Sequence, residues 1–198
     1  MKFENNLSLQ MQDIKLVLLN QSHIEPLAAL AVNKKIWEYA PDDFYQPEIF
    51  KRKWLDKAMT KMANNERTCF VIFRGDQITG SSSYYNIDVD NKTLDIGYTW
   101  FDPDYWGTKL NPLSKLILMD HAFYSLQFNR VGFFVDSINL RSCHALKKLD
   151  VKQEGILRNH LILSNGRIRH SVVFSVISEE WPETRKNIMK NIEMRSLP

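Results

Sequence analysis

The stretch from residue 96 to residue 111, IGYTWFDPDYWGTKLN, decides how this chain folds. The segment 94–101 predicts a strand whose even-numbered residues, from Leu94 to Trp100, share one face of a sheet. Asp102 and Pro103 break that strand, and a short turn follows. Pro112 then favours the first turn of a helix, where its missing N–H group costs nothing, and this helix is expected to run to about Leu126. Strand, turn and helix therefore follow one another directly.

A second apolar run, Arg130 to Val135, comes after that helix and predicts another strand. A strand, a helix and a strand in this order form a parallel crossover unit. Asn139 is expected to cap a helix through Leu149, and an apolar stripe predicts a helix from Pro47 to Asn64. The other expected elements are a strand at 14–19, a helix from His23 to about Val32 capped by Ser22, and hairpins at 68–87 and 156–177. The fold class is therefore mixed α/β with one central sheet.

The composition is that of an ordinary globular chain. Its 198 residues, 44% of them hydrophobic, predict one domain over residues 1–198, with a short helical tail at about 181–198. The net charge of +3 comes with no polycationic tail, so no nucleic-acid partner is expected. The two cysteines and the scattered histidines match no metal-ligand spacing, so no metal is expected. The absence of a signal peptide or membrane-spanning run predicts a soluble, cytoplasmic protein.

The turn around Gly107 has the chemistry of an anion site. The first N–H groups of a helix have no partners within the helix, and the helix dipole is positive at that end. A glycine also lets the backbone approach a bound anion closely, which makes a pyrophosphate a candidate ligand. Many strand-to-helix turns contain a glycine without binding phosphate, so the turn alone leaves the ligand open.

The order and spacing of four motifs resemble the GNAT N-acetyltransferase family, and within it the ribosomal-protein N-terminal acetyltransferases (RimJ/RimL-like). These motifs are Ile96–Trp100, Pro103–Thr108, Asn139–Ser142 and Glu154–Arg158. The resemblance implies the acyl-CoA N-acyltransferase fold, in which the strands around Trp100 and Arg130 splay apart. It also implies acetyl-CoA as the acyl donor and a primary amine as the acceptor, with a protein or peptide N-terminal amine as the leading candidate. A homodimer is compatible with it.

The resemblance also assigns residues to the cofactor. Pantetheine would run along the backbone of Tyr98, Thr99 and Trp100. The pyrophosphate would lie on the N–H groups of the turn formed by Trp106, Gly107, Thr108, Lys109, Leu110 and Asn111. Asn139 would contact the pantetheine arm, and Arg141 would meet the 3′-phosphate or an acidic acceptor.

This chain departs from the family pattern at the turn and after the next helix. Trp106, Lys109 and Asn111 stand where the family usually has arginine or glutamine, then glycine, then glycine or alanine. A Lys109 side chain that faces away leaves the pyrophosphate site open, and one that enters the site obstructs it. Asp150 stands where the family usually has a helix-ending glycine, and aspartate tolerates the positive φ that this position needs.

Acetyl transfer to an amine needs a base, N–H groups near the developing oxyanion and a proton for the leaving thiolate. Asp95 is the leading candidate for the base, because it lies in the strand beside the implied thioester channel, and Glu154 is the second. Ser142, Tyr98 or a water molecule would return the proton. A covalent acyl-cysteine is not expected, because both cysteines lie in apolar runs.

Other functions remain open at this point. The acceptor could be a polyamine or an antibiotic instead of an N-terminus. The two missing small residues of the turn also allow a non-catalytic CoA-binding or interaction module. A ribosome- or RNA-binding domain ranks last, because the sequence lacks interleaved basic and aromatic motifs.

Overall fold

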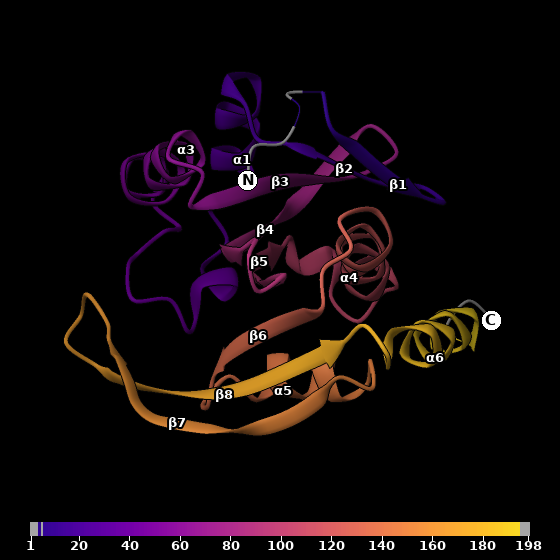
Figure 1. Cartoon of the computed structure of the whole chain (residues 1–198). Coiled ribbons are helices and arrows are strands. Elements are labelled where there is room, and N and C mark those ends of the chain that lie inside the picture. The colour runs from indigo at the N-terminus through magenta and orange to yellow at the C-terminus, as the bar shows by residue number, and fades with distance from the viewer. Residues whose placement is uncertain (1–3, 5, 195–198) are drawn as a thin grey trace.

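One sheet of eight strands organises the chain in the computed structural model, which describes residue 4 and residues 6–194 (Figure 1). The strands are β1 Ser8–Met11, β2 Ile14–Leu18, β3 Arg67–Arg74, β4 Gln77–Asp88, β5 Thr93–Phe101, β6 Arg130–Asp136, β7 Lys152–Ile162 and β8 Ile168–Ile177. Their order in the sheet is β1-β2-β3-β4-β5-β6-β8-β7. The pair β5–β6 is parallel, and the other neighbouring pairs are antiparallel.

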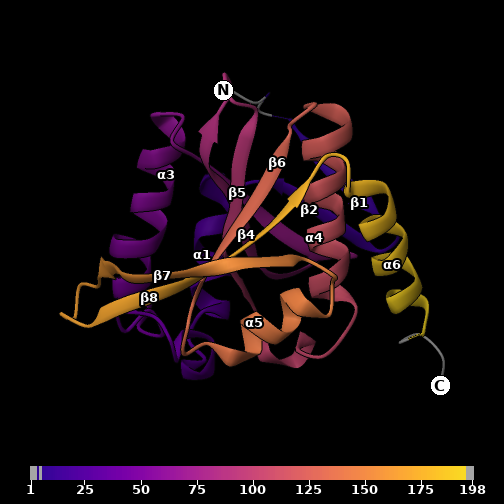
Figure 2. The ribbon, with the colours of Figure 1, turned by 60° about the horizontal axis from the view of Figure 1, so that its bottom comes forward.

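Helices cover both faces of this sheet, as Figures 1 and 2 show. They are α1 Ile24–Leu30, α2 Pro47–Ile49, α3 Asp56–Ala63, α4 Leu110–Asp120, α5 Leu140–Lys147 and α6 Trp181–Met194. A π-helical turn, Phe50–Leu55, joins α2 to α3, and another, His121–Ser125, extends α4. One apolar cluster joins the sheet to α4, α5 and α6, and a second joins it to α1 and α3.

Most expected elements lie where the residue pattern places them, including the helix after Pro112 and both hairpins. The capping prediction for the first helix was wrong. A short 3-10 turn, Gln21–His23, precedes α1, and Asn20 caps this turn because its side-chain oxygen accepts from the Ser22 N–H group at 3.0 Å. The N-cap residue of α1 itself is His23, which forms no side-chain cap. Strand β1 was not expected. The structure does not describe residues 195–198 of the predicted tail. Most of the N-terminal residues on which the signal-peptide prediction rests also lie outside the described residues.

Strand β5 does not keep a simple alternation, so the predicted shared face from Leu94 to Trp100 was wrong. Leu94 and Ile96 lie in the cluster with α4, whereas Trp100 lies in the cluster with α3. Tyr98 has a φ of 53°, and the register with β4 shifts at this point. A bulge of this kind inserts an extra residue and reverses the faces beyond it. The bulge thus turns Trp100 toward α3.

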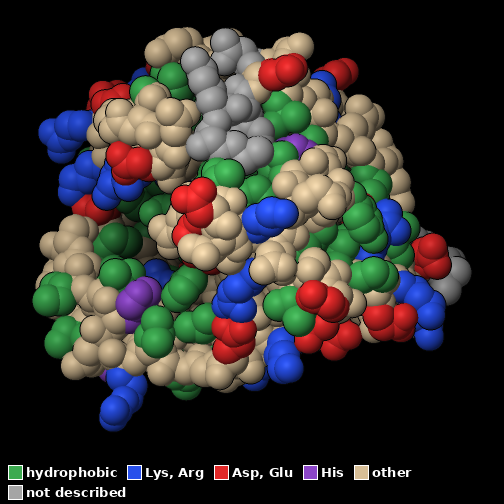
Figure 3. Space-filling model, viewed as in Figure 1, with side chains coloured by type: hydrophobic (Ala, Val, Ile, Leu, Met, Phe, Trp, Pro, Cys, Tyr) green, Lys and Arg blue, Asp and Glu red, His purple; other side chains and the backbone are tan. Residues whose placement is uncertain are grey.

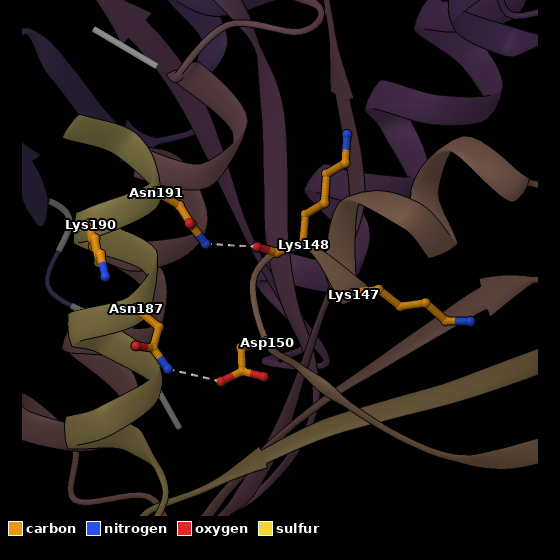
Figure 4. A pocket seen from close by; sticks show the side chains of 6 residues that line it. All are labelled: Lys147, Lys148, Asp150, Asn187, Lys190 and Asn191. Atoms are coloured by element: carbon orange, nitrogen blue, oxygen red, sulfur yellow. Dashed lines mark hydrogen bonds between the residues drawn. The ribbon is translucent and has the colours of Figure 1, made fainter. Parts of the chain in front are cut away.

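The end of α5 packs against α6, and Asp150 makes the turn between α5 and β7. Asp150 has a φ of 59°, as expected for the residue at the family's glycine position. The N–H group of Val151 donates to the carbonyl of Leu146, and that of Asp150 to the carbonyl of Lys147, which is the bonding of a Schellman motif. Figure 4 shows Asn187 of α6 bonded to the Asp150 carboxylate at 3.0 Å. The substitution of glycine is therefore accommodated.

Candidate active site

Strands β5 and β6 pair over three residues and then separate. The paired positions are Thr93 with Arg130, Leu94 with Val131, and Asp95 with Gly132; we call this short ladder the closed end. Strand β4 pairs the other side of β5 as far as Phe101. The side of Ile96–Phe101 that faces β6 is therefore without a strand partner among the described residues, and we call it the open edge. Backbone N–H and C=O groups need hydrogen-bond partners, so the open edge can bind an extended ligand. The predicted splay is confirmed.

The turn that follows the open edge places backbone N–H groups at the start of α4. Gly107 has a φ of 78°, a conformation that favours glycine. The Thr108 hydroxyl donates to the carbonyl of Tyr105 at 2.7 Å and accepts from the N–H group of Leu110 at 3.2 Å. No side chain caps α4 at Lys109. The Thr108 hydroxyl therefore engages the N–H group of Leu110, and the other N–H groups of the turn lie at a positive helix end.

The side chain of Lys109 lies away from this turn. Its ammonium donates to Gln12 Oε1 at 3.2 Å and lies 4.0 Å from the Asp13 carboxylate, both in the β1–β2 turn. Of the two orientations considered for Lys109, the structure has the one that leaves the helix N-terminus open. Its charge is shared with Asp13, so the backbone is the main source of anion-binding groups here.

Helix α5 brings a second group of predicted residues to the same place. Asn139 caps the helix, because its side-chain oxygen accepts from the N–H group of Ser142 at 3.0 Å. The Arg141 guanidinium lies 3.8 Å from the centre of the Trp106 ring, which is part of the turn before α4. Predicted cofactor-binding residues from the turn and from α5 therefore meet across the gap between β5 and β6.

Asp95 lies at the closed end and is half-buried. A Cβ atom on Gly132 would lie 2.2 Å from its Oδ1 atom, so only glycine leaves room for this carboxylate. Asn86 donates a hydrogen bond to Asp95 at 2.8 Å. Burial raises the pKa of Asp95, opposed by the Asn86 bond and the nearby Arg130. A carboxylate with a raised pKa is a stronger base.

Glu154, the other candidate base, is held by a network. Both of its oxygens accept from Arg130, at 2.6 and 2.7 Å, and one also accepts from Ser175 at 2.7 Å. The bonds with Arg130 lower the pKa of Glu154. The geometry therefore favours Asp95 as a proton acceptor and Glu154 as a residue that positions Arg130 beside it.

The face of β5 toward α3 also holds Arg67, a charged residue that the sequence pattern did not reveal. Tyr85 pairs with Asp95, and its ring lies 5.2 Å from that of Tyr98. Arg67, the first residue of β3, lies under Tyr98 and is 4% exposed. A charged residue before the apolar run 68–73 was the only signal for it, and such residues are usually solvated.

Several other expected features can be placed as well. Cys69 and Cys143 are both buried, and burial raises the pKa of Cys143. Within the described residues, no cluster of three metal-ligating side chains occurs, and no helix is long and apolar enough to cross a bilayer. Acidic and basic side chains are interspersed on the face in Figure 3.

A groove between α5 and α6 lies outside the gap between the diverging strands β5 and β6. Figure 4 shows its lining side chains, which come from the two helices and the residues that follow α5: Lys147, Lys148, Asp150, Asn187, Lys190 and Asn191. None of them belongs to β5, β6 or the turn before α4. The candidate active site is therefore the gap between β5 and β6.

Residues 13–152 match the acetyltransferase (GNAT) domain model. The uncharacterized N-acetyltransferase p20 of Bacillus licheniformis is 28% identical over 64% of this chain and 68% of its own length. The ribosomal-protein-serine acetyltransferase of Escherichia coli is 26% identical over 60% of this chain and 68% of its own. Among solved structures, a GCN5-related N-acetyltransferase from Brucella melitensis has a TM-score of 0.84 at 22% identity, covering 96% of this chain and 86% of that one. RimL in complex with coenzyme A has a TM-score of 0.72 at 19% identity, covering 86% and 98%.

Proposed function

This chain belongs to the GNAT acetyltransferase family, and we propose that it acetylates the N-terminal α-amine of a protein or peptide. Members of the family use acetyl-CoA and an amine acceptor, so the chain is an acetyl-CoA-dependent acetyltransferase. The finer proposal, a protein or peptide acceptor, draws support from the relatives named for ribosomal proteins. The observation that carries the acetyl-CoA-dependent activity is the open edge of β5 next to the start of α4, where Lys109 forms no side-chain cap.

The open edge can pair with the pantetheine of coenzyme A, and the turn before α4 can bind its pyrophosphate. Pantetheine carries amide groups that can pair with an extended strand, and Tyr98 to Trp100 offer unpaired backbone toward β6. The pyrophosphate would lie on the N–H groups from Gly107 to Asn111, at the positive end of α4. RimL, a structural neighbour, has been solved with coenzyme A. Acetyl-CoA bound in this way places its thioester near the bulge at Tyr98.

Asp95 is the proposed base of the reaction. It lies three residues before Tyr98 in β5, and burial raises its pKa. An α-amine has an ordinary pKa of about 7.7 to 8.0, whereas a lysine has one of about 10.4. A carboxylate acting through water can deprotonate the first far more readily than the second. This difference favours an N-terminal acceptor.

The leaving thiolate also needs a proton, and Ser142 and Tyr98 are the candidate side-chain donors. Ser142 is half-buried in the first turns of α5, which also carries Asn139 and Arg141. Tyr98 is 48% exposed at the bulge. We assign this step to Ser142, because Tyr98 packs on Arg67 and Tyr85 through its ring.

A coenzyme A release assay over matched acceptors tests this proposal. The panel contains peptides with a free N-terminus, the same peptides with a blocked N-terminus and an internal lysine, a polyamine and an aminoglycoside. We expect release with the free N-termini and none with the blocked peptides, and mass spectrometry should locate the acetyl group on the α-nitrogen. Release with the polyamine or the aminoglycoside alone would replace the proposed acceptor.

A further inference from the structure

Arg67 is a buried cation without a carboxylate beside it. Its residue is 4% exposed, and within the described part of the chain it forms no ion pair. Burying a charge without a partner costs folding free energy, so buried arginines are normally paired. The position of this arginine therefore calls for an explanation beyond packing.

Two aromatic rings flank the guanidinium. Its Cζ atom lies 4.0 Å from the centre of the Tyr98 ring and 4.9 Å from that of the Trp54 ring. Contacts of this kind offset part of the cost of burial. A guanidinium has five N–H donors, and contacts with ring faces do not replace the hydrogen bonds that these donors form.

Those N–H bonds are only partly used. Nε donates to Ser83 Oγ at 2.8 Å, and Nη2 donates to Cys69 Sγ at 3.8 Å, a weak acceptor. Nη1 makes no hydrogen bond to the described residues, and it is not among their buried polar atoms that lack a partner, so it reaches solvent. Arg67 therefore presents unused donors at one edge.

Trp100 provides a second unused donor in the same cluster. Its Nε1 atom is buried and has no hydrogen-bond partner among the described residues. Its ring centre lies 5.9 Å from that of Trp54, the ring that also contacts Arg67. Buried donors in proteins are nearly always bonded. Two unused donors, one of them charged, thus border the same tryptophan.

We propose that Arg67 binds a carboxylate of the acceptor. The preferred substrate is then an amine with a carboxylate a few bonds from its nitrogen, such as a peptide whose first residue is aspartate. Planar guanidinium groups bind carboxylates through two parallel hydrogen bonds. This inference rests on the proposed function, because it takes the bulge at Tyr98 as the place of acetyl transfer.

The geometry of β5 places this recognition beside the chemistry. Tyr98 contributes its backbone to the open edge and its ring to the Arg67 contact. Asp95, the proposed base, pairs with Tyr85, whose ring contacts Tyr98 on the same face of the sheet. An amine held by its carboxylate at Arg67 would therefore lie between the base and the thioester.

The test compares two peptides that differ only in a first residue of aspartate or asparagine. For the wild type we expect kcat/KM for the aspartate peptide to be at least about tenfold higher. Arg67→Gln should bring this ratio to about one, because it should lower kcat/KM for the aspartate peptide far more than for the asparagine peptide. Arg67→Lys should give an intermediate ratio, because it keeps the charge and loses the planar fork.

Arg74→Gln is the matched control, because Arg74 lies at the other end of β3 and is exposed; it should keep the wild-type ratio. The acetyl-CoA affinity of each variant reports whether the fold is intact. Equal wild-type rates with both peptides would overturn the inference. So would an equal loss on both peptides in Arg67→Gln, since that is the sign of a structural role.

A binding experiment distinguishes failure of this inference from failure of the proposed function. Calorimetric titration of the wild type, loaded with coenzyme A, uses the N-acetylated forms of the same two peptides. Tighter binding of the aspartate form supports the carboxylate site even if no peptide is acetylated, in which case only the proposed N-terminal acceptor fails. Equal binding of both forms, or none, contradicts the carboxylate site.

Discussion

The two ends of the β5–β6 junction are built in opposite ways. At the closed end the protein satisfies its own groups: three residue pairs form a ladder, and Glu154 accepts hydrogen bonds from Arg130 and Ser175. At the open edge the backbone from Ile96 to Phe101 faces β6 without a ladder, and α4 begins beside it with no side-chain cap from Lys109. Strand β5 therefore stabilises the fold at its closed end and leaves backbone groups available to a ligand at its open edge.

This difference shows how a stable sheet can hold a reactive site. The closed end holds Asp95 against Gly132, so the proposed base has a defined position without a ligand. The open edge leaves backbone groups without a strand partner, and the proposed cofactor would complete their hydrogen bonds. Substitutions at the closed end should therefore change turnover, and substitutions at the open edge should change cofactor affinity.

The strongest way to break the comparison is Asp95→Asn at the closed end. Loss of a general base lowers turnover by about 10²–10³-fold, whereas acetyl-CoA affinity should stay within about threefold. Steady-state kinetics and calorimetry measure the two quantities. Asp76→Asn, in the exposed β3–β4 turn, serves as the control and should change neither. Unchanged turnover in Asp95→Asn would remove Asp95 from this role.

Asp95→Asn should also change how the free energy of unfolding depends on pH. Burial raises the pKa of Asp95, so the folded chain holds this proton more tightly than the unfolded chain. Wild-type stability contributed by this group is thus present below the unfolded pKa of about 3.9 and falls as pH rises through the raised folded value. Asp95→Asn should therefore melt at a higher temperature than the wild type at pH 7.

Gly132→Ala tests whether the closed end holds the Asp95 carboxylate in place. The new Cβ atom would lie 2.2 Å from the Asp95 carboxylate, so that side chain must move. We expect a loss of about 2 kcal/mol in the free energy of unfolding, together with reduced turnover. Gly155→Ala in β7 meets no atom within 4 Å and should cost less than about 0.5 kcal/mol. Similar values for both variants would contradict this reading.

A matched pair of glycines tests the turn before α4. Gly107 and Gly166 have φ values of 78° and 81°, and a Cβ atom on either would meet nothing within 4 Å. Alanine should therefore cost each site about 1 kcal/mol of backbone strain. Only Gly107→Ala should raise the Kd for acetyl-CoA, by about fivefold. An equal Kd in both variants would show that the turn before α4 does not bind the cofactor.

The smallest expected effect concerns Lys115, which donates to Asn111 in the first turn of α4 at 3.0 Å. Burial lowers the pKa of Lys115 to about 8. Between this value and about 10.4 the unfolded chain holds a proton that the folded chain has lost, so stability should rise with pH across that window. Lys115→Met should add about 1 kcal/mol at pH 7 and abolish this rise. Urea unfolding at pH 7 and pH 9.5 measures both.

Much of the fold was predictable, because most helices and strands have sequence signals within a few neighbouring residues. The helix after Pro112 and the Asn139 cap follow from side-chain chemistry that acts over three or four residues. The splay of β5 and β6 came from the resemblance of the motifs, not from periodicity. Strand β1 escaped prediction because four residues at a sheet edge, half of them polar, give no distinct pattern.

The acceptor side was much less predictable. A bulge at Tyr98 requires a positive φ, and without glycine there the sequence offers no sign of it. The role of Arg67 depends on Trp54, Tyr98 and Ser83, which come from separate elements and meet only in the folded chain. Asp95 was named from its place in the strand, but its burial against Gly132 is a tertiary property.

Hydrogen exchange with and without acetyl-CoA tests whether the cofactor binds between β5 and β6. We expect the cofactor to slow exchange of the amides of residues 96–101 and 107–111. The amides of residues 93–95, already paired at the closed end, should change little. Protection of the closed end alone, or no added protection along the open edge and the turn, would contradict a cofactor site between β5 and β6.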